Sequence, residues 1–224
     1  MVNGVSRVAQ WIAIACAAAT LLVLALLHVV SPEYDPSWRM VSEYANGKNG
    51  WLLAVMFLTW GVSDWALLVG LWREEKRALF RVGLLFLFVA GLGTGSASLL
   101  DINNPLHDIA GALGIIGTPV AAVLITAALR RSSAWSVRKR ILLWSSNLTW
   151  VSVVLFAASF GVMVLTFQRA GIKMDPQAGP TAHAPAGVMG YVGWADRLIV
   201  VVYCLWVSIL AWQAIKLSEK PRAT

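Results

Sequence analysis

Charged side chains are scarce in this chain of 224 residues. Asp, Glu, Lys and Arg make up 13% of it, whereas hydrophobic residues make up 58%. Because a soluble domain carries roughly a quarter of charged residues, this composition excludes an ordinary soluble protein. Cysteine is scarce as well: Cys16 and Cys204 both lie inside apolar stretches, which argues against an extracellular disulfide framework.

Familiar catalytic and binding motifs are also missing. The chain has no GxSxG, HExxH, phosphate-loop or dinucleotide-binding fingerprint. Its basic residues do not alternate with aromatic ones as they do in nucleic-acid-binding surfaces. We therefore expect no cofactor, no resident metal and no nucleic-acid partner. The histidines have no HxxxH spacing, although a zinc or haem site joining His28 and His107 stays open as an alternative.

Long apolar segments dominate the sequence instead. Each has the length of about 20 residues that crosses a bilayer, and several tryptophans lie near their ends, as is typical of membrane interfaces. The pattern predicts an all-α fold: a polytopic membrane helix bundle that forms a single domain over residues 1–224. The first segment is too long for a signal peptide, so we expect it to be retained. The six expected spans are residues 8–30, 50–72, 79–100, 107–129, 141–167 and 195–217.

The basic residues predict the orientation of the chain. Most of the 18 Lys and Arg residues lie before the first span, in the loops after the second and fourth spans, and in the tail. The positive-inside rule therefore predicts a multi-pass protein of the cell membrane with both termini in the cytoplasm. All three histidines and most carboxylates then lie on or near the outer side, where we expect any binding or reactive surface.

The first outer loop, "SPEYDPSWRMVSEYANGKNGW", is unusually polar and long. Asp35 before Pro36 is typical of a helix start, and Gly47 of a helix end. Between them, Trp38, Val41 and Ala45 recur at helical spacing. The pattern predicts a short amphipathic helix, residues 36–45, on the outer surface; a simple connector with a turn of helix is the alternative.

Three stretches carry a resemblance to a known family. "HVVSPEYDPSWRMVSEYANGKNGWL", "LLDINNPLHDIAGALG" and "GWADRL" resemble a family of small prokaryotic membrane proteins catalogued as domain of unknown function 998. The resemblance implies six spans and implies no activity. The positions that match it are Ser42, Glu43, Tyr44, Gly50, Asp101, His107 and Arg197, with Asp196 beside the last.

A ligand site is predicted at the outer face. Asp101 ends the third span and His107 begins the fourth, and an imidazole beside a carboxylate suits general-base chemistry or an oriented metal ligand. In the alternative interpretation, Asn103 or Asn104 caps the fourth span and His107 only faces lipid headgroups. The full set of expected ligand-binding residues is Glu43, Tyr44, Asp101, His107, Asp196 and Arg197.

One carboxylate lies within a span. Asp64 is expected at the depth of Ser146 and Asn147 in the fifth span, because the two spans run in opposite directions. An ionisable group at such depth is usually functional or paired. Two interpretations remain open: a hydrogen-bonded clasp of Asp64 with Ser146 and Asn147, or a relay for protons or ions. Small residues in the third and fourth spans, among them Gly91, Gly95 and Gly114, predict close packing of those spans.

These features favour a binding protein over an enzyme. The expected function is to bind or move a membrane lipid or small amphiphile at an outer polar pocket covered by the helix at residues 36–45. One alternative is an intramembrane, metal-assisted, lipid-modifying enzyme that uses His107 and Asp101. Another is an accessory membrane subunit without a ligand, and the sequence leaves the oligomeric state open.

Overall fold

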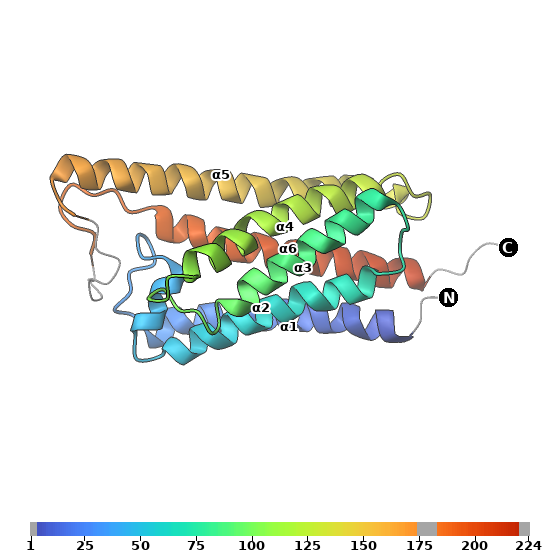
Figure 1. The fold of residues 1–224 in the computed structure, drawn as a ribbon, viewed down its shortest axis with the longest axis horizontal. Helices are drawn as coiled ribbons and strands as arrows, with labels where there is room; N and C mark the ends of the chain where they lie inside the picture. The colour runs from blue at the N-terminus through green and yellow to red at the C-terminus, as the bar shows by residue number, and fades with distance from the viewer. Residues whose placement is uncertain (1–3, 174–182, 220–224) are drawn as a thin grey trace.

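The structure is a computed structural model that describes residues 4–173 and 183–219. Six long helices form one bundle (Figure 1), and each is long and apolar enough to cross a membrane. The predicted all-α, six-span fold is therefore confirmed. The helices are α1 (Gly4–Val30), α2 (Gly50–Leu71), α3 (Ala78–Ser96), α4 (His107–Leu129), α5 (Lys139–Ala170) and α6 (Val192–Ser218).

Helix α6 lies at the centre of the bundle. Helix α6 is the most buried of the six and packs against α1, α2 and α5, whereas α5 is the least buried. Helices α1 and α2 form one close pair, and α3 and α4 form another. Both termini lie at the same end of the bundle (Figure 1), where Arg7 forms an ion pair with Glu219 at 2.9 Å.

Glycines allow the pairs to approach backbone to backbone. A Cβ added at Gly61 of α2 would lie 2.8 Å from the carbonyl oxygen of Gly91 in α3. A Cβ at Gly93 would lie 2.6 Å from the carbonyl oxygen of Ala110 in α4. Small residues at such contacts are the usual means of close helix association in membranes. The tight packing predicted for the third and fourth spans is confirmed.

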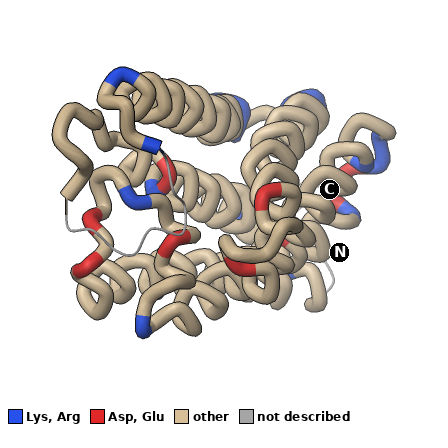
Figure 2. Tube along the Cα trace, turned by 60° about the vertical axis from the view of Figure 1, so that its left-hand side comes forward, with Lys and Arg blue, Asp and Glu red and all other residues tan. Residues whose placement is uncertain are grey.

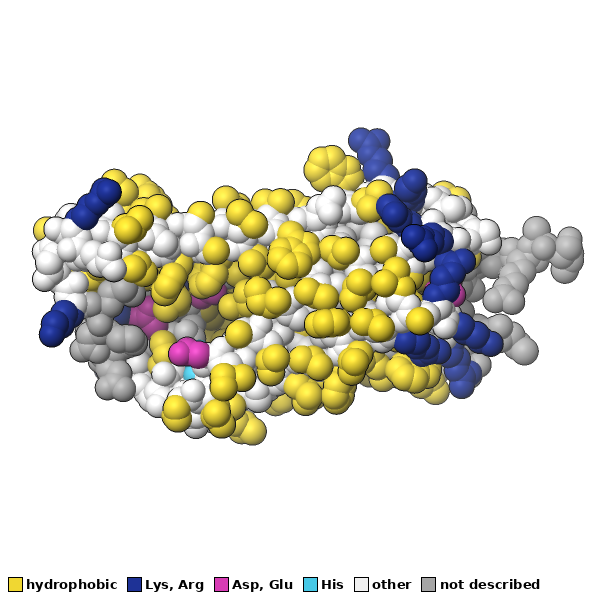
Figure 3. Space-filling view, turned by 45° about the horizontal axis from the view of Figure 1, so that its top comes forward, with side chains coloured by type: hydrophobic (Ala, Val, Ile, Leu, Met, Phe, Trp, Pro, Cys, Tyr) yellow, Lys and Arg dark blue, Asp and Glu magenta, His cyan; other side chains and the backbone are white. Residues whose placement is uncertain are grey.

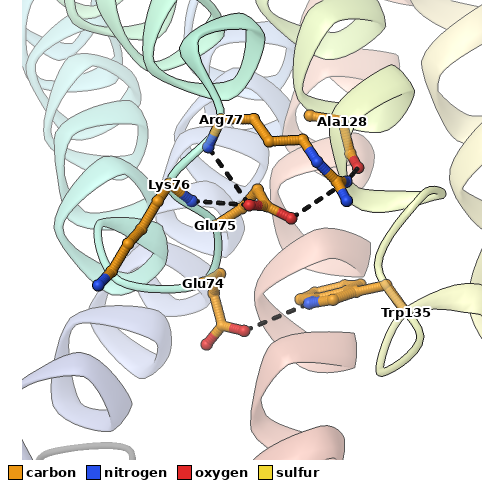
Figure 4. Close-up of polar contacts among 6 residues, drawn as sticks. All are labelled: Glu74, Glu75, Lys76, Arg77, Ala128 and Trp135. Carbon is orange, nitrogen blue, oxygen red and sulfur yellow. Dashed lines mark hydrogen bonds and ion pairs between the residues drawn. The ribbon is translucent and has the colours of Figure 1, made fainter.

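The two ends of the bundle differ in charge. The end that carries the termini, called the basic end below, holds most of the Lys and Arg side chains (Figure 3). Its loops are joined by hydrogen bonds (Figure 4): Trp135 donates to Glu74 at 3.2 Å, and Arg77 donates to the carbonyl oxygen of Ala128 at 3.2 Å. Figure 2 brings forward the opposite end, called the acidic end, around which Asp and Glu residues lie.

The segment at residues 31–49, at the acidic end, differs from the prediction. The expected helix start forms only a turn, in which the backbone N–H of Ser37 donates to the Asp35 carboxylate at 2.9 Å. The only helix here is a short 3₁₀ helix, η1 (Val41–Asn46), that ends at the expected Gly47. It does not lie on the surface, because Glu43 and Tyr44 are 6% and 1% exposed. The expected amphipathic helix at residues 36–45 is therefore wrong.

The reason is that α6 occupies the hydrogen-bonding groups that an α-helix would need. The backbone N–H of Val41 donates to the Asp196 carboxylate at 2.7 Å. Four residues earlier, the carbonyl oxygen of Ser37 accepts a hydrogen bond from the backbone N–H of Gly193 at 3.0 Å. These are the two groups that an α-helix would join to each other. The segment instead packs into the end of the bundle.

Candidate functional site

Arg197, in the second turn of α6, holds the acidic end together. Its guanidinium donates to His28 Nε2 at 2.7 Å, to the Arg39 carbonyl oxygen at 2.7 Å and to the Tyr44 hydroxyl at 3.0 Å. A fourth bond runs to the carbonyl oxygen of Gly193 at 2.9 Å, and the side chain is 4% exposed. Arg197 therefore links α1, the segment at residues 31–49 and α6, and its donors are used inside the protein.

His28 is the partner of Arg197 on α1. Its Nδ1 lies 2.6 Å from the carbonyl oxygen of Leu24, to which only a protonated nitrogen can donate. Its Nε2 accepts from Arg197, so that nitrogen carries no proton, and the ring is a neutral imidazole. The ring also stacks on Trp194 with 6.4 Å between centroids. The geometry thus gives His28 a positioning role that its place in the sequence did not indicate.

The carboxylate of Glu43 is also bonded inside the protein. Its carboxylate pairs with the Arg39 guanidinium at 2.5 Å and accepts a hydrogen bond from the backbone N–H of Met40 at 2.9 Å. Arg39 also lies over the Trp38 ring, 4.1 Å from its centroid. A buried ion pair of this kind fixes the shape of its segment, because separating it would leave a charge without compensation. Glu43 and Tyr44 therefore position the segment in this structure.

Tyr34 completes the packed part of the segment. It is 3% exposed and lies against Tyr44 with 5.2 Å between ring centroids. Burial raises the pKa of the Tyr34 phenol, and the nearby carboxylates of Glu33 and Glu43 raise this pKa further against the opposing effect of Arg39. The phenol therefore stays uncharged across the physiological pH range.

Asp196 lies beside Arg197 in α6, at the acidic end. It is half-buried and accepts the bond from Val41 described above. Its carboxylate interacts electrostatically with Arg197, Glu43 and His107. Asp196 therefore adds a carboxylate beside the Arg197 network, bonded to the segment at residues 31–49.

The predicted pairing of Asp101 with His107 does not form. His107 Nδ1 lies 2.8 Å from the carbonyl oxygen of Leu100, and the exposed Asp101 carboxylate accepts from the backbone N–H of Asn103 at 2.9 Å. The tight turn between α3 and α4 supplies a backbone partner to each side chain and keeps the two apart. Within residues 4–173 and 183–219, no three His, Cys, Asp or Glu side chains are grouped as metal ligands would be.

The predicted clasp of Asp64 with Ser146 and Asn147 is wrong. It required α2 and α5 to be neighbours, but α2 packs against α1, α3 and α6. Asn147 is exposed on the outside of α5, and Ser146 is buried. Asp64 is fully buried, and neither of its carboxyl oxygens has a hydrogen-bond partner among the described residues.

Toward the acidic end, helix α4 diverges from α5 while it stays packed against α3. One face of α4, formed by residues three or four positions apart, can be followed along the whole helix. At the acidic end this face is less buried: Asp108 is exposed and Gly111 is half-buried, while the half-buried Ile115 packs against the core. At the basic end the same face is buried, with Ala122, Thr126 and Leu129 packed inside. Figure 1 shows the same divergence of α4 from α5.

The divergence leaves a hollow between α4 and α5 that opens sideways (Figure 3). On α5, the half-buried or exposed Phe156, Ser159 and Phe160 interrupt an otherwise buried face at the level of this opening. Farther toward the acidic end α5 is packed again, with Met163 and Phe167 against Trp38 and Val192. Figure 3 shows acidic side chains inside the hollow. The hollow thus combines apolar walls with a carboxylate-bearing end.

A comparison with known protein families shows to which family the chain belongs. A family model described as "Protein of unknown function (DUF998)" matches residues 14–213. The chain belongs to the DUF998 family. No curated protein and no solved structure matches it. The family predicted from the three quoted stretches is thereby confirmed.

The structure brings together most of the expected site of this DUF998 protein. Glu43, Tyr44, Asp196 and Arg197 lie together at the acidic end, and Asp196 interacts electrostatically with His107, whereas Asp101 is exposed and bonded to the Asn103 backbone. The role of His28 and the opening between α4 and α5 were not predicted from the sequence. Arg39 and Glu43, four positions apart, have the spacing of a helical ion pair, and they form one. The run of small residues on α4 gave no sign that the helix diverges.

Proposed function

We propose that this DUF998 protein binds a membrane amphiphile, with its tail between α4 and α5 and its headgroup at the acidic end. The face of α4 that carries Asp108 and Gly111 supports this most directly, because Asp108 is exposed and a Cβ at Gly111 would have open space, whereas the rest of the face is packed. The hollow opens toward the side of the bundle (Figure 3), where a lipid tail would enter without crossing water. Sites for such ligands are typically apolar clefts with a few placed polar groups.

The charges around the hollow favour an amine-bearing headgroup. On α4 and α6, the carboxylates at this end are the exposed Asp108 and the half-buried Asp196. The guanidinium groups of Arg39 and Arg197 are already engaged, by Glu43 and by His28 and Tyr44. The remaining cation on the bordering helices is the exposed Arg169 in the last turn of α5. The amine of a zwitterionic headgroup would therefore find carboxylate acceptors and its phosphate a cation, whereas a purely anionic headgroup would leave the carboxylates unused.

Filling the hollow should remove the ligand without unfolding the protein. A Cβ at Gly111 would have no heavy atom within 4 Å, so Gly111→Phe places its ring in open space on the α4 side. We expect a several-fold loss of phosphatidylethanolamine retained by the detergent-purified protein, measured by native mass spectrometry. Phosphatidylglycerol should be retained less than phosphatidylethanolamine by the unaltered protein.

The matched control is Gly161→Phe on α5. A Cβ there also has nothing within 4 Å, but the position lies on a different side of α5 from Phe156 and Phe160. This variant should retain phosphatidylethanolamine as the unaltered protein does. Equal retention by both variants, or no preference between the two lipids, would contradict the proposal and would favour an accessory subunit without a ligand.

The proposal also requires a defined orientation of the acidic end. The concentration of Lys and Arg at the basic end supports a cytoplasmic location for both termini. In a background with Cys16 and Cys204 replaced, a cysteine at the exposed Lys48 should react with a membrane-impermeant maleimide in intact cells. A cysteine at the exposed Ser133 should react only after the cells are opened. Reaction of the Ser133 variant in intact cells would place the hollow in the inner leaflet.

A further inference from the structure

A second polar site lies in the interior of the bundle, away from the hollow. Asp64 of α2 is 0% exposed, and neither carboxyl oxygen has a hydrogen-bond partner among the described residues. Its Cβ lies 3.2 Å from the place a Cβ would take at Gly91 of α3. Asp64 also interacts electrostatically with Tyr203 and Cys204 of α6. The carboxyl group therefore lies where α2, α3 and α6 meet.

Among the residues that the structure describes on α1, α3 and α6, no cation is placed to compensate a negative charge at Asp64. On α3 the only charged residue is Arg81, in the first turn at the basic end. On α1 the titratable residues are Arg7, Cys16 and His28. Arg7 and His28, the two that can carry a positive charge, lie near opposite ends of the helix. On α6, Asp196 and Arg197 lie at one end and Lys216 at the other, and the nearer Tyr203 and Cys204 bring no positive charge.

The neighbouring hydroxyl groups do not donate hydrogen bonds to Asp64 either. Tyr203 donates to the carbonyl oxygen of Ile115 in α4 at 2.6 Å, so its proton is committed elsewhere. The hydroxyl of Ser63, next to Asp64 in the chain, donates to the carbonyl oxygen of Ala13 at 3.0 Å. An isolated carboxylate in such surroundings costs far more than a neutral carboxylic acid. The packed structure is therefore compatible with the neutral acid.

We propose that Asp64 is a proton-binding site, and that the bound proton holds α2 closed against α3 and α6. The contact at this level is close: a Cβ at Gly61, one turn before Asp64, would lie 2.8 Å from the carbonyl oxygen of Gly91. Both carboxyl oxygens of Asp64 are themselves buried from solvent, so bulk water does not solvate a charge there. Loss of the proton therefore requires these helices to part and admit water, which couples the conformation of the bundle to proton binding. This inference is independent of the amphiphile site.

Infrared spectroscopy tests the proton directly. At neutral pH the unaltered protein should show the carbonyl stretch of a protonated carboxylic acid in a non-aqueous environment. Asp64→Asn should lose this band, and Asp101→Asn, which alters an exposed carboxylate, should keep it. If the unaltered protein has no such band, or if Asp64→Asn keeps it, the proposal is overturned.

The dependence of stability on pH gives a second readout. The folded state keeps a proton on Asp64 that the unfolded chain releases to water, so stability is highest at acidic pH and falls as the pH rises. The melting temperature of the unaltered protein should therefore decrease from acidic to neutral pH more steeply than that of Asp64→Asn. Asp64→Leu, which is also neutral, should show the same shallow profile and serves if the Asn variant folds poorly. Parallel profiles for all three proteins would overturn the proposal.

Discussion

Replacing Arg197 by alanine is expected to destabilise the protein by several kcal/mol, because each buried hydrogen-bonding group left unpaired costs about 1–3 kcal/mol. The change leaves four acceptors without their donor, contributed by His28, Arg39, Tyr44 and Gly193. Buried groups left unpaired in this way each carry a desolvation penalty. The free energy of unfolding in detergent, followed by denaturant titration or by the melting temperature, measures the effect.

Arg169 provides the matched control for this prediction. It lies in the last turn of α5 and is exposed, so Arg169→Ala should change the free energy of unfolding by about 0.5 kcal/mol or less. The comparison separates the loss of a buried network from the loss of one positive charge at the acidic end. A similar loss of stability in both variants would show that Arg197 does not hold this end together.

Gly193→Ala is expected to have the second large effect. A Cβ at this position would meet the carbonyl oxygen of Pro36 and would lie 2.5 Å from that of Arg39. Backbone atoms cannot move aside as a flexible side chain would, so the segment at residues 31–49 has to shift away from α6. We expect a loss of about 1–3 kcal/mol, as in other overpacked sites. Hydrogen–deuterium exchange should rise at Val41, whose N–H bonds to Asp196.

The direction of this change is diagnostic because alanine normally favours helices. In an unconstrained helical position, replacing Gly by Ala stabilises by about 0.8–1.0 kcal/mol. Gly161→Ala is such a position, since nothing lies within 4 Å of the added Cβ, and it should stabilise the protein slightly. A Gly193→Ala variant that is as stable as Gly161→Ala would contradict the docking of the segment on α6.

The six spans could be predicted because hydropathy and length determine them almost alone. Each apolar stretch must satisfy its backbone internally in a bilayer, which selects a helix irrespective of its neighbours. The segment at residues 31–49 lacks this constraint. Its local signals correctly indicated an end at Gly47, but the helix start predicted at Asp35 forms only a turn. Gly193 and Asp196, over 150 residues away, take the bonds that an α-helix would have used.

The sequence predicted at which end of the bundle the site residues lie, but it did not predict their contacts. The orientation of the spans was enough to group Glu43, Tyr44, Asp196 and Arg197 at one end, where they meet. The sequence does not determine which way each side chain points. Asp101 and His107 lie close in sequence, yet each bonds to a separate backbone group. The partner of Asp64 depended on which helices are neighbours, and the sequence does not specify that α2 lies beside α3 and α6 instead of α5.

An experimental structure of the protein in a phosphatidylethanolamine bilayer tests the central claim most directly. The account predicts acyl-chain density between Gly111 of α4 and Phe160 of α5, with a headgroup amine within hydrogen-bonding distance of Asp108 or Asp196. Helices α4 and α5 packed together along their whole length, so that the face around Gly111 and Ile115 is buried without a ligand, would contradict it.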